Sequence, residues 1–313
     1  MTKILKAEEF INEQIVNEMG MRVRNANIRQ RMSDQLEKYN LVYNEATGLY
    51  DSNGNIKVEQ DLVSPDGKLI IKFGVVKGVF DCSYLNLTTL EGAPQEVGGN
   101  FWCHHNHLTT LEGVPQKVGG NFWCYNNQLT SLKGSPQKVG GSFDYRENQL
   151  TTLEGAPQEV SGSFDCGHNK LTSLEGAPQE VGKSFYCYGN RLTTLEGAPQ
   201  EVGGSFHCRE NQLTTLEGAP QEVGGNFNCS DNQLKTLEGA SQVVGGYFDC
   251  SNNQLTSLEG APQKVGEDFN CYENDIVFDE THFYGCLPDV IGGKLNAGSD
   301  CDYELAKDYY NPR

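Results

Sequence analysis

The sequence contains no apolar run that approaches the roughly 20 residues needed for a membrane-spanning helix. Its first residues, MTKILKAEEFINEQIV, carry a charge every few positions, unlike the continuous apolar stretch of a secretory signal peptide. These two absences predict a soluble, cytoplasmic protein with no membrane partner.

Positive charge is also scarce: 24 Lys and Arg stand against 42 Asp and Glu, and the formal net charge is -18 at pH 7. A nucleic acid or an anionic membrane would meet repulsion over most of such a surface. Residues 1–45 hold seven basic and seven acidic residues, so the acidic excess lies downstream of them. We therefore expect no nucleic-acid partner, and a basic or charge-mixed macromolecule instead.

Metal-binding spacings are missing as well, because neither Cys-x-x-Cys nor His-x-x-x-His occurs among the 11 Cys and six His. We predict no metal and no cofactor. Cys286 and Cys301 lie near His282 at the C-terminal end, but a lone thiol and a lone imidazole do not define a nucleophile and its base. We predict that the protein is not an enzyme, with an effector carrying a minor catalytic C-terminal cap as the alternative.

A repeat of 21 residues begins at Phe80 and is the dominant feature of the sequence. A typical unit is F-x-C-x-x-N-x-L-T-x-L-E-G-A-P-Q-E-V-G-G-x, and a fixed period of this length indicates stacked coils that bury their apolar edges against one another. Ten of the 14 phenylalanines occupy one position of the unit: Phe80, Phe101, Phe122, Phe143, Phe164, Phe185, Phe206, Phe227, Phe248 and Phe269.

Within each unit, Phe and Cys alternate with variable residues, which is the pattern of a short strand with Phe and Cys pointing inward. Nine cysteines share this position and Tyr145 is the exception, so we expect a row of buried, unbridged thiols. The Asn that follows the strand in every unit but the first, which has Leu85, is expected to satisfy backbone groups left unpaired by the turning chain. The Gly-Ala-Pro and Gly-Gly segments predict an extended return without helix.

The motif V-G-G-x-F-x-C-x-x-N-x-L-x-x-L resembles the bacterial and bacteriophage class of leucine-rich repeat, over about residues 76–276. This chain departs from the commonest bacterial pattern by having Phe for the strand Leu, Cys beside it, and 21 rather than 20 residues per unit. The resemblance implies a mainly β, right-handed, curved solenoid, in which a parallel sheet of about eleven strands lines the concave face.

Both ends of the chain are atypical, as the terminal coils of a solenoid require. Two amphipathic helices are expected upstream, and they either cap the solenoid or form a separate dimerisation or targeting module. Leu295 and Ala297 fit the Phe and Cys positions of a degenerate last strand, followed by a short helix near Tyr303 to Asp308. The expected organisation is 1–42 as an N-terminal helical segment, 43–79 as a β-hairpin N-cap, 80–274 as leucine-rich repeats, and 275–313 as a degenerate final coil and C-cap.

The outward strand positions lie one, three and four residues after each Phe, and they vary while the rest of the unit hardly changes. Both tryptophans and four of the six histidines occur there, which indicates a binding surface, since Trp, Tyr and Arg dominate interface hot spots. The alternative is that aromatic residues simply favour strands. We predict that a partner contacts Trp102, His104, His105, Trp123, Tyr125, Arg146, His168, Tyr186, Tyr188, His207 and Arg209.

The sequence therefore favours a non-enzymatic scaffold that binds a protein by occupying its surface. The resemblance to phage repeats suggests a host-directed or counter-defence inhibitor as one form of this function. The alternative is an acidic decoy that imitates DNA, for which the candidates are the acidic residues on the return side of the coils, Glu91, Glu112, Glu154, Glu175, Glu196, Glu217, Glu238 and Glu259.

Overall fold

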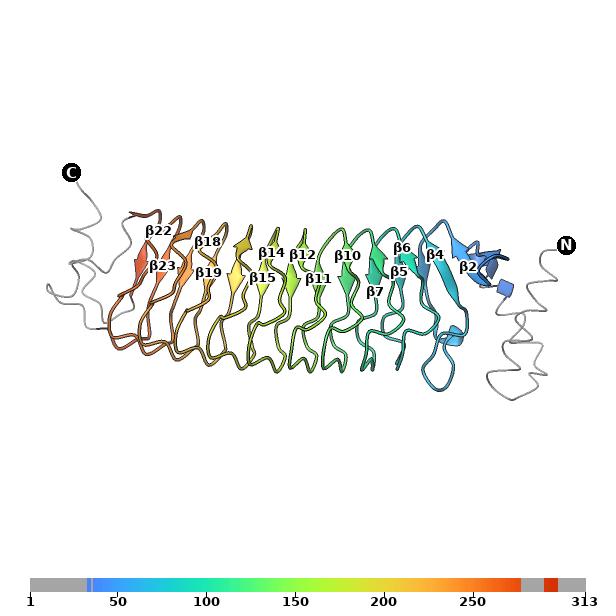
Figure 1. The fold of residues 1–313 in the computed structure, drawn as a ribbon, viewed down its shortest axis with the longest axis horizontal. Helices are drawn as coiled ribbons and strands as arrows, with labels where there is room; N and C mark the ends of the chain where they lie inside the picture. Colours follow the sequence, from blue (N-terminus) through green and yellow to red (C-terminus); the bar gives the residue numbers. More distant parts are fainter. Residues whose placement is uncertain (1–32, 35, 277–289, 298–313) are drawn as a thin grey trace.

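The computed structural model describes residues 33–34, 36–276 and 290–297, and these form an elongated rod of stacked coils (Figure 1). Each coil contributes one short strand to a 12-stranded sheet in which all neighbouring strands are parallel. The predicted mainly β solenoid of leucine-rich-repeat type, with a parallel sheet, is confirmed.

The strands of this long sheet are β3 (Ile56–Lys57), β5 (Phe80–Asp81), β7 (Phe101–Trp102), β9 (Phe122–Trp123), β11 (Phe143–Asp144), β13 (Phe164–Asp165), β15 (Phe185–Tyr186), β17 (Phe206–His207), β19 (Phe227–Asn228), β21 (Phe248–Asp249), β23 (Phe269–Asn270) and β25 (Leu295–Asn296). Consecutive Phe residues pair in register from β5 to β23, so every row of side chains runs straight along the rod.

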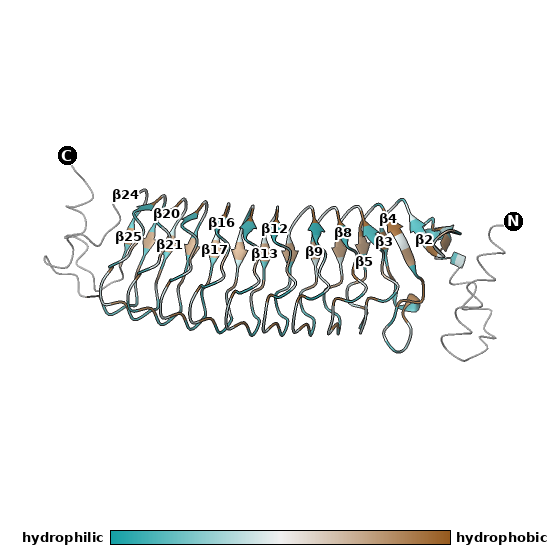
Figure 2. Ribbon diagram, in the orientation of Figure 1, coloured by the Kyte–Doolittle hydropathy of each residue, from teal (hydrophilic) through white to brown (hydrophobic). Residues whose placement is uncertain are grey.

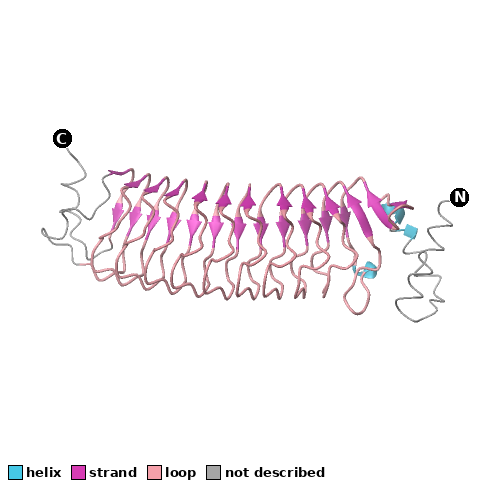
Figure 3. Ribbon diagram, viewed as in Figure 1, coloured by secondary structure: helices cyan, strands magenta, loops and turns pink. Residues whose placement is uncertain are grey.

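A second row of strands, which was not predicted from the sequence, is formed in most coils by the last two residues of the Gln-x-Val segment, as at Glu96–Val97. It forms a six-stranded sheet and a separate seven-stranded sheet beside the long sheet, with loops along the opposite edge (Figure 3). The first contains β1 (Val42–Asn44), β2 (Leu49–Ser52), β4 (Phe73–Val76), β6 (Glu96–Val97), β8 (Lys117–Val118) and β10 (Lys138–Val139). The second contains β12 (Glu159–Val160), β14 (Glu180–Val181), β16 (Glu201–Val202), β18 (Glu222–Val223), β20 (Val243–Val244), β22 (Lys264–Val265) and β24 (Val290–Ile291).

Glycine is favoured where these second strands stack, because backbone meets backbone there. A Cβ atom added to Gly119 would lie 2.1 Å from the carbonyl oxygen of Gly98 in the preceding coil. The glycine that follows the buried Val in most coils thus permits the spacing of about 4.8 Å between parallel strands, although Ser161 follows Val160 and Lys77 follows Val76.

The interior is filled by the Phe, Cys and Leu rows, as predicted, and apolar and polar residues alternate within each coil (Figure 2). Phe101 and Phe122 are stacked with ring centroids 5.5 Å apart. The row cysteines from Cys82 to Cys250 are buried free thiols, and burial raises the pKa of Cys166 well above its usual range. Such thiols are small core residues rather than nucleophiles.

The Asn row joins the coils as predicted. Asn127 Nδ2 donates to the carbonyl oxygen of Cys103 in the preceding coil and to that of Cys124 in its own coil, both at 3.1 Å. Its Oδ1 accepts a hydrogen bond from the Leu108 N–H at 3.0 Å. A single amide therefore satisfies backbone groups of two adjacent coils.

Tyr145 interrupts this regularity. Its ring is fully buried, with its centroid 5.6, 5.7 and 5.9 Å from those of Phe122, Phe143 and Phe164, and its hydroxyl hydrogen-bonds the Ser135 hydroxyl. The ring planes of Phe122 and Phe164 make angles of 45° and 44° with the ring plane of Phe143, whereas adjacent rings elsewhere in the row differ by 27° or less. The second row of strands breaks at the same place, between β10 and β12.

At the N-terminal end the long sheet has one more strand than the eleven expected. β1 and β2 form the predicted antiparallel hairpin, but β2 pairs with β4 and β3 pairs with β5 in parallel. The prediction of hairpins throughout 43–79 was therefore wrong, because 49–79 forms a degenerate coil with Ile56 in the Phe position. An insertion in this coil contains the short 3-10 helix η1 (Gln60–Leu62) and a small loop closed by an isolated Val63–Leu69 bridge.

The segment before β1 packs against this first coil. Residues 33–34 and 36–38 are helical, Leu36, Tyr39 and Leu41 pack against the core, and the Tyr39 hydroxyl donates to the Lys57 carbonyl. These residues cap the solenoid; the remainder of the two expected helices lies outside the described residues.

At the other end, Leu295 pairs with Phe269, so the predicted degenerate last strand is confirmed. The helix expected near Tyr303 lies outside the described residues.

Candidate protein-binding face

Three rows of side chains lie on the outward face of the long sheet, one, three and four residues after each Phe; we call them the first, second and third rows. In the first row, in-register pairing places two aspartates side by side, with one pair of aromatic residues before them and one pair after them. In chain order these neighbours are Trp102, Trp123, Asp144, Asp165, Tyr186 and His207.

The N-terminal part of this face is an aromatic cluster, which we define as Tyr84, Trp102, His104, His105, Trp123 and Tyr125. The two indoles are stacked 5.2 Å apart, and the His104 ring is stacked on Tyr125 at 4.4 Å. Tyr84, which the sequence-based prediction omitted, is stacked on His105 at 4.3 Å and is 63% exposed. The cluster is thus a continuous layer of rings with an open outer edge.

His104 was predicted to be a contact residue, but its side chain is covered by the rings around it and is only 7% exposed. Its Nδ1 lies 3.2 Å from Nδ1 of His105. Burial lowers the pKa of His104, and the neighbouring His105 lowers it further. His104 is therefore neutral at pH 7 and supports the cluster as a ring rather than as a charge.

The second row adds two arginines that lie over aromatic rings. The guanidinium carbon of Arg146 is 4.9 Å from the centroid of Tyr125, and that of Arg209 is 5.3 Å from the centroid of Tyr188. Between them Gly167 leaves space that Tyr188 occupies, because a Cβ there would lie 2.7 Å from the Tyr188 ring. The row therefore alternates cations and rings in direct contact.

The predicted residues beyond Arg146 form a second aromatic group. Tyr186 is stacked on His207 at 5.1 Å, and His168 meets the Tyr188 ring edge-on at 4.9 Å. Burial, followed by the charge of Arg209, lowers the pKa of His207. Apart from Arg146, the predicted residues thus fall into two groups, one on each side of it: five aromatic residues before it, and four aromatic residues with Arg209 after it.

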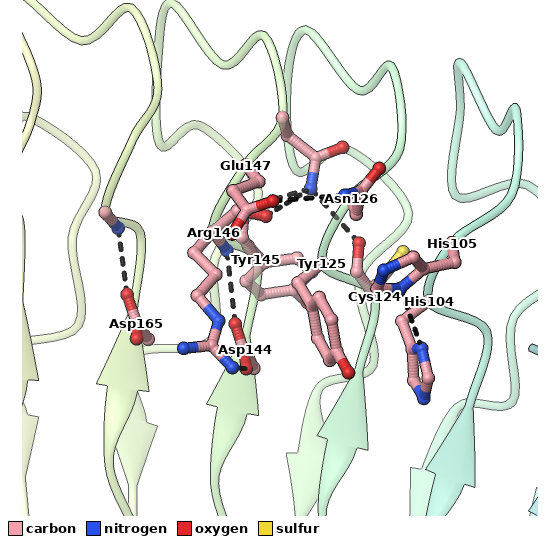
Figure 4. A network of polar contacts seen from close by, with 12 residues as sticks. His104, His105, Cys124, Tyr125, Asn126, Asp144, Tyr145, Arg146, Glu147 and Asp165 are labelled. Atoms are coloured by element: carbon pink, nitrogen blue, oxygen red, sulfur yellow. Dashed lines mark hydrogen bonds and ion pairs between the residues drawn. The ribbon is translucent and has the colours of Figure 1, made fainter.

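Asp144 and Asp165, which we call the acid pair, were missed by the sequence-based prediction although they occupy the same outward row. Arg146 Nη2 lies 3.2 Å from Asp144 Oδ2, and its backbone N–H donates to Asp144 Oδ1, also at 3.2 Å (Figure 4). Asp165 Oδ1 accepts from the Gly167 N–H at 2.9 Å. Burial, with the neighbouring charge of Asp165, raises the pKa of Asp144 to about 7.

The third row adopts left-handed backbone conformations in every coil, for instance φ 54° at His105 and φ 53° at Glu147. This conformation costs about 1–2 kcal/mol for residues other than Gly, Asn and Asp. A signal was present in the sequence, since Asn126, Gly189 and Asp231 occupy this position. The third row thus carries His and Glu side chains at a backbone conformation that they rarely adopt.

Two further costs fall on the same face. Trp102 Nε1 and Arg146 Nε are buried without hydrogen-bond partners, and Tyr50 Oη is the only other such atom in the described part of the chain. Each unsatisfied buried polar atom costs about 1–3 kcal/mol. Two of these three atoms therefore lie on the outward face of the long sheet.

Within the described residues, no group of three or more His, Cys, Asp or Glu side chains is arranged to hold a metal ion. No helix in the same residues is long and apolar enough to cross a membrane. Cys286, Cys301 and His282, considered for a catalytic cap, lie outside the described residues.

Similarity to known proteins is found among solved structures. The chain is similar to YopM from Yersinia enterocolitica WA-314, with 19% sequence identity and a TM-score of 0.49, over 78% of this chain and 57% of YopM. It thus spans a little over half the length of that protein. No family model matches the sequence, and no curated protein matches it. The assignment of a leucine-rich-repeat type solenoid follows from the coils described above.

Proposed function

We propose that this protein is a non-enzymatic, cytoplasmic scaffold that binds a protein partner through the outward face of the long sheet. The observation that carries the proposal is the aromatic cluster, in which stacked Trp, Tyr and His rings lie on the outward face of the sheet and not in the core. Rigid aromatic side chains lose little conformational entropy on binding and are the residues that dominate protein interfaces.

The shape of the face supports the same conclusion. In-register rows on 12 strands about 4.8 Å apart provide a continuous surface, and a standard interface needs about 800 Å² per partner. Binding there would block whatever surface of the partner it covers. Together with the resemblance of the repeat to phage sequences, this favours a host-directed inhibitor as the specific form.

Removing the two indoles tests the proposal. We expect Trp102→Ala/Trp123→Ala to weaken partner capture at least tenfold, because hot-spot truncations cost about 2–4 kcal/mol. Affinity purification followed by quantitative mass spectrometry measures the change. Tyr272→Ala is the matched control, since Tyr272 occupies the second row near the other end and is 37% exposed. Equal prey lists for both variants would exclude the aromatic cluster as the anchor.

A second candidate, the acidic DNA-imitating decoy, is favoured by a different observation. Residues 140–313 contain 10 basic and 27 acidic residues, whereas residues 1–139 contain 14 and 15. On four consecutive coils this excess forms two parallel rows of exposed carboxylates: Glu154, Glu175, Glu196 and Glu217, and Glu159, Glu180, Glu201 and Glu222. Two charges per coil of about 4.8 Å approach the density of DNA, about one per 1.7 Å.

The decoy function predicts competition with double-stranded DNA for basic DNA-binding proteins. We expect this competition to fall steeply with added salt and to be lost when Glu175, Glu180, Glu196 and Glu201 are changed to lysine. The measurement uses DNA-binding proteins that are first purified from a lysate on immobilised DNA. The fluorescence anisotropy of labelled DNA bound to these proteins then reports how much DNA the added protein displaces. The Trp102→Ala/Trp123→Ala variant should compete like the wild type. Salt-independent competition would contradict the decoy function.

A further inference from the structure

Two histidines of the aromatic cluster, His104 and His105, share a hydrogen bond that depends on their protonation; we call them the histidine pair. Their Nδ1 atoms are 3.2 Å apart (Figure 4). A neutral imidazole has one nitrogen that donates and one that accepts, whereas an imidazolium only donates. The pair can therefore take up one extra proton and keep the bond. A second proton leaves a hydrogen on all four ring nitrogens, so no acceptor remains and two positive charges face each other.

Neither imidazole can move without disturbing a tyrosine, because Tyr84 of the preceding coil and Tyr125 of the following coil contact both rings. His104 is stacked on Tyr125 at 4.4 Å and makes a T-shaped contact with Tyr84 at 5.3 Å. His105 is stacked on Tyr84 at 4.3 Å and makes a T-shaped contact with Tyr125 at 5.2 Å. His104 is 7% exposed and Tyr84 is 63% exposed, so Tyr84 and His105 form the side of the cluster next to solvent.

The charged groups around the pair do not favour a second proton. Burial and then His105 lower the pKa of His104; Asp81 of the preceding coil acts in the opposite sense, and Arg146 lowers it further. Along the third row the nearest acid, Glu147, lies two coils beyond His105 and accepts a hydrogen bond from the coil between them. The second proton is therefore taken up only in acid, below the ordinary histidine pKa of about 6.5.

The pair is specific to this coil. The equivalent second-row and third-row positions hold opposite charges in another coil, where Arg209 Nη1 lies 2.8 Å from Glu210 Oε1. Such an ion pair keeps both charges above about pH 5. Only the coil of Phe101 has histidine at both positions, so only there does mild acid convert an attraction into a repulsion.

We infer that the histidine pair makes the aromatic cluster sensitive to acid: the cluster is closed while the pair holds at most one extra proton, and it opens at Tyr84 and His105 when a second proton binds. This inference rests on the proposed function, since it assigns a regulation to the face that binds the partner. Partner binding should be strong near neutral pH and weaken in acid, because it depends on rings that are assembled before the partner arrives.

The two tryptophans report on the cluster directly. They are the only ones in the chain, and the ring centroid of Trp123 is 6.4 Å from that of His104. We expect the emission maximum of the wild-type protein to move to longer wavelength between pH 7.5 and pH 5.0, as opening of the cluster brings water to the indoles. This range spans the ordinary pKa of histidine.

The matched variants are His105→Asn and His168→Asn, which make the same change at the same row position inside and outside the cluster. The fold accommodates asparagine there, because Asn126 and Asn252 occupy this left-handed position in other coils. We expect His105→Asn, which leaves one imidazole, to lose the shift of the emission maximum, and His168→Asn to keep it. No shift in the wild type, or an equal shift in His105→Asn, would overturn the inference.

Partner capture provides the second readout, using the prey whose capture depends on the two tryptophans. Between pH 7.5 and pH 5.0, capture by the wild type and by His168→Asn should fall at least fivefold more than capture by His105→Asn. Asp144, whose pKa is raised to about 7, titrates in the same range but is present in all three proteins, so the comparison removes its contribution. If capture depends on the tryptophans but falls equally in all three, the inference fails and the proposed function stands.

Discussion

Replacing Tyr145 with cysteine is expected to lower the free energy of unfolding by about 3–5 kcal/mol, even though cysteine is the residue that the other coils have at this position. The substitution removes a fully buried ring from between three phenylalanines and leaves the Ser135 hydroxyl in an apolar cavity without its partner. The cavity and the unpaired hydroxyl both contribute. Urea unfolding followed by circular dichroism measures the loss.

The double variant Tyr145→Cys/Ser135→Ala separates the two contributions. Ser135→Ala removes the hydroxyl that Tyr145→Cys leaves unpaired. We therefore expect the double variant to regain about 1–3 kcal/mol of unfolding free energy relative to Tyr145→Cys alone. Tyr145→Phe keeps the ring and should cost only the hydrogen bond. If Ser135→Ala added its own full cost to the double variant instead, the two residues would not be energetically coupled.

Truncating an interior member of the Asn row is expected to cost at least about 3 kcal/mol. Asn169 Nδ2 donates to the carbonyl oxygens of Tyr145 at 3.1 Å, Cys166 at 3.0 Å and Gly167 at 3.1 Å, and its Oδ1 accepts from the Leu150 N–H at 2.9 Å. Asn169→Ala would leave these buried backbone groups of two coils unpaired, at about 1–3 kcal/mol for each group.

Two comparisons make this prediction specific to the buried row. Asn274, in the last full coil, makes the same bonds but is partly exposed, so water should replace part of what Asn274→Ala removes. Gln233→Ala, at an exposed position beside the row, should change stability by no more than about 0.5 kcal/mol. Equal losses for Asn169→Ala and Asn274→Ala would mean that burial does not set the cost.

The sequence predicted the solenoid and its register because the buried rows hardly vary. Phe, Cys, Asn and Leu recur at a fixed period, and only one face of a short strand can bury Phe and Cys together. The second row of strands was not predictable in the same way, because two-residue strands are too short to show alternation. The coil containing Ile56 was missed because an insertion lengthens its period and its residues depart from the consensus.

The candidate site was predicted in outline only. The outward position of Trp102 and Trp123 follows from the register, and the structure places their rings in contact. Which outward residues are covered, as His104 is, depends on side-chain directions that a variable position does not specify. The acid pair was missed because aspartate at the end of a strand is normally explained by the turn that follows it.

The pairing of coils also bears on how such a chain changes during evolution. Most lateral bonds join residues about one period apart, so recombination that inserts or deletes 21 codons in frame leaves every remaining coil beside an equivalent neighbour. Ser135 and Tyr145 are the exception, because they lie in successive coils and complement only each other. Deletion of the unit that contains one of them would leave the other without its hydrogen-bond partner. We therefore expect these two units to be duplicated or deleted together.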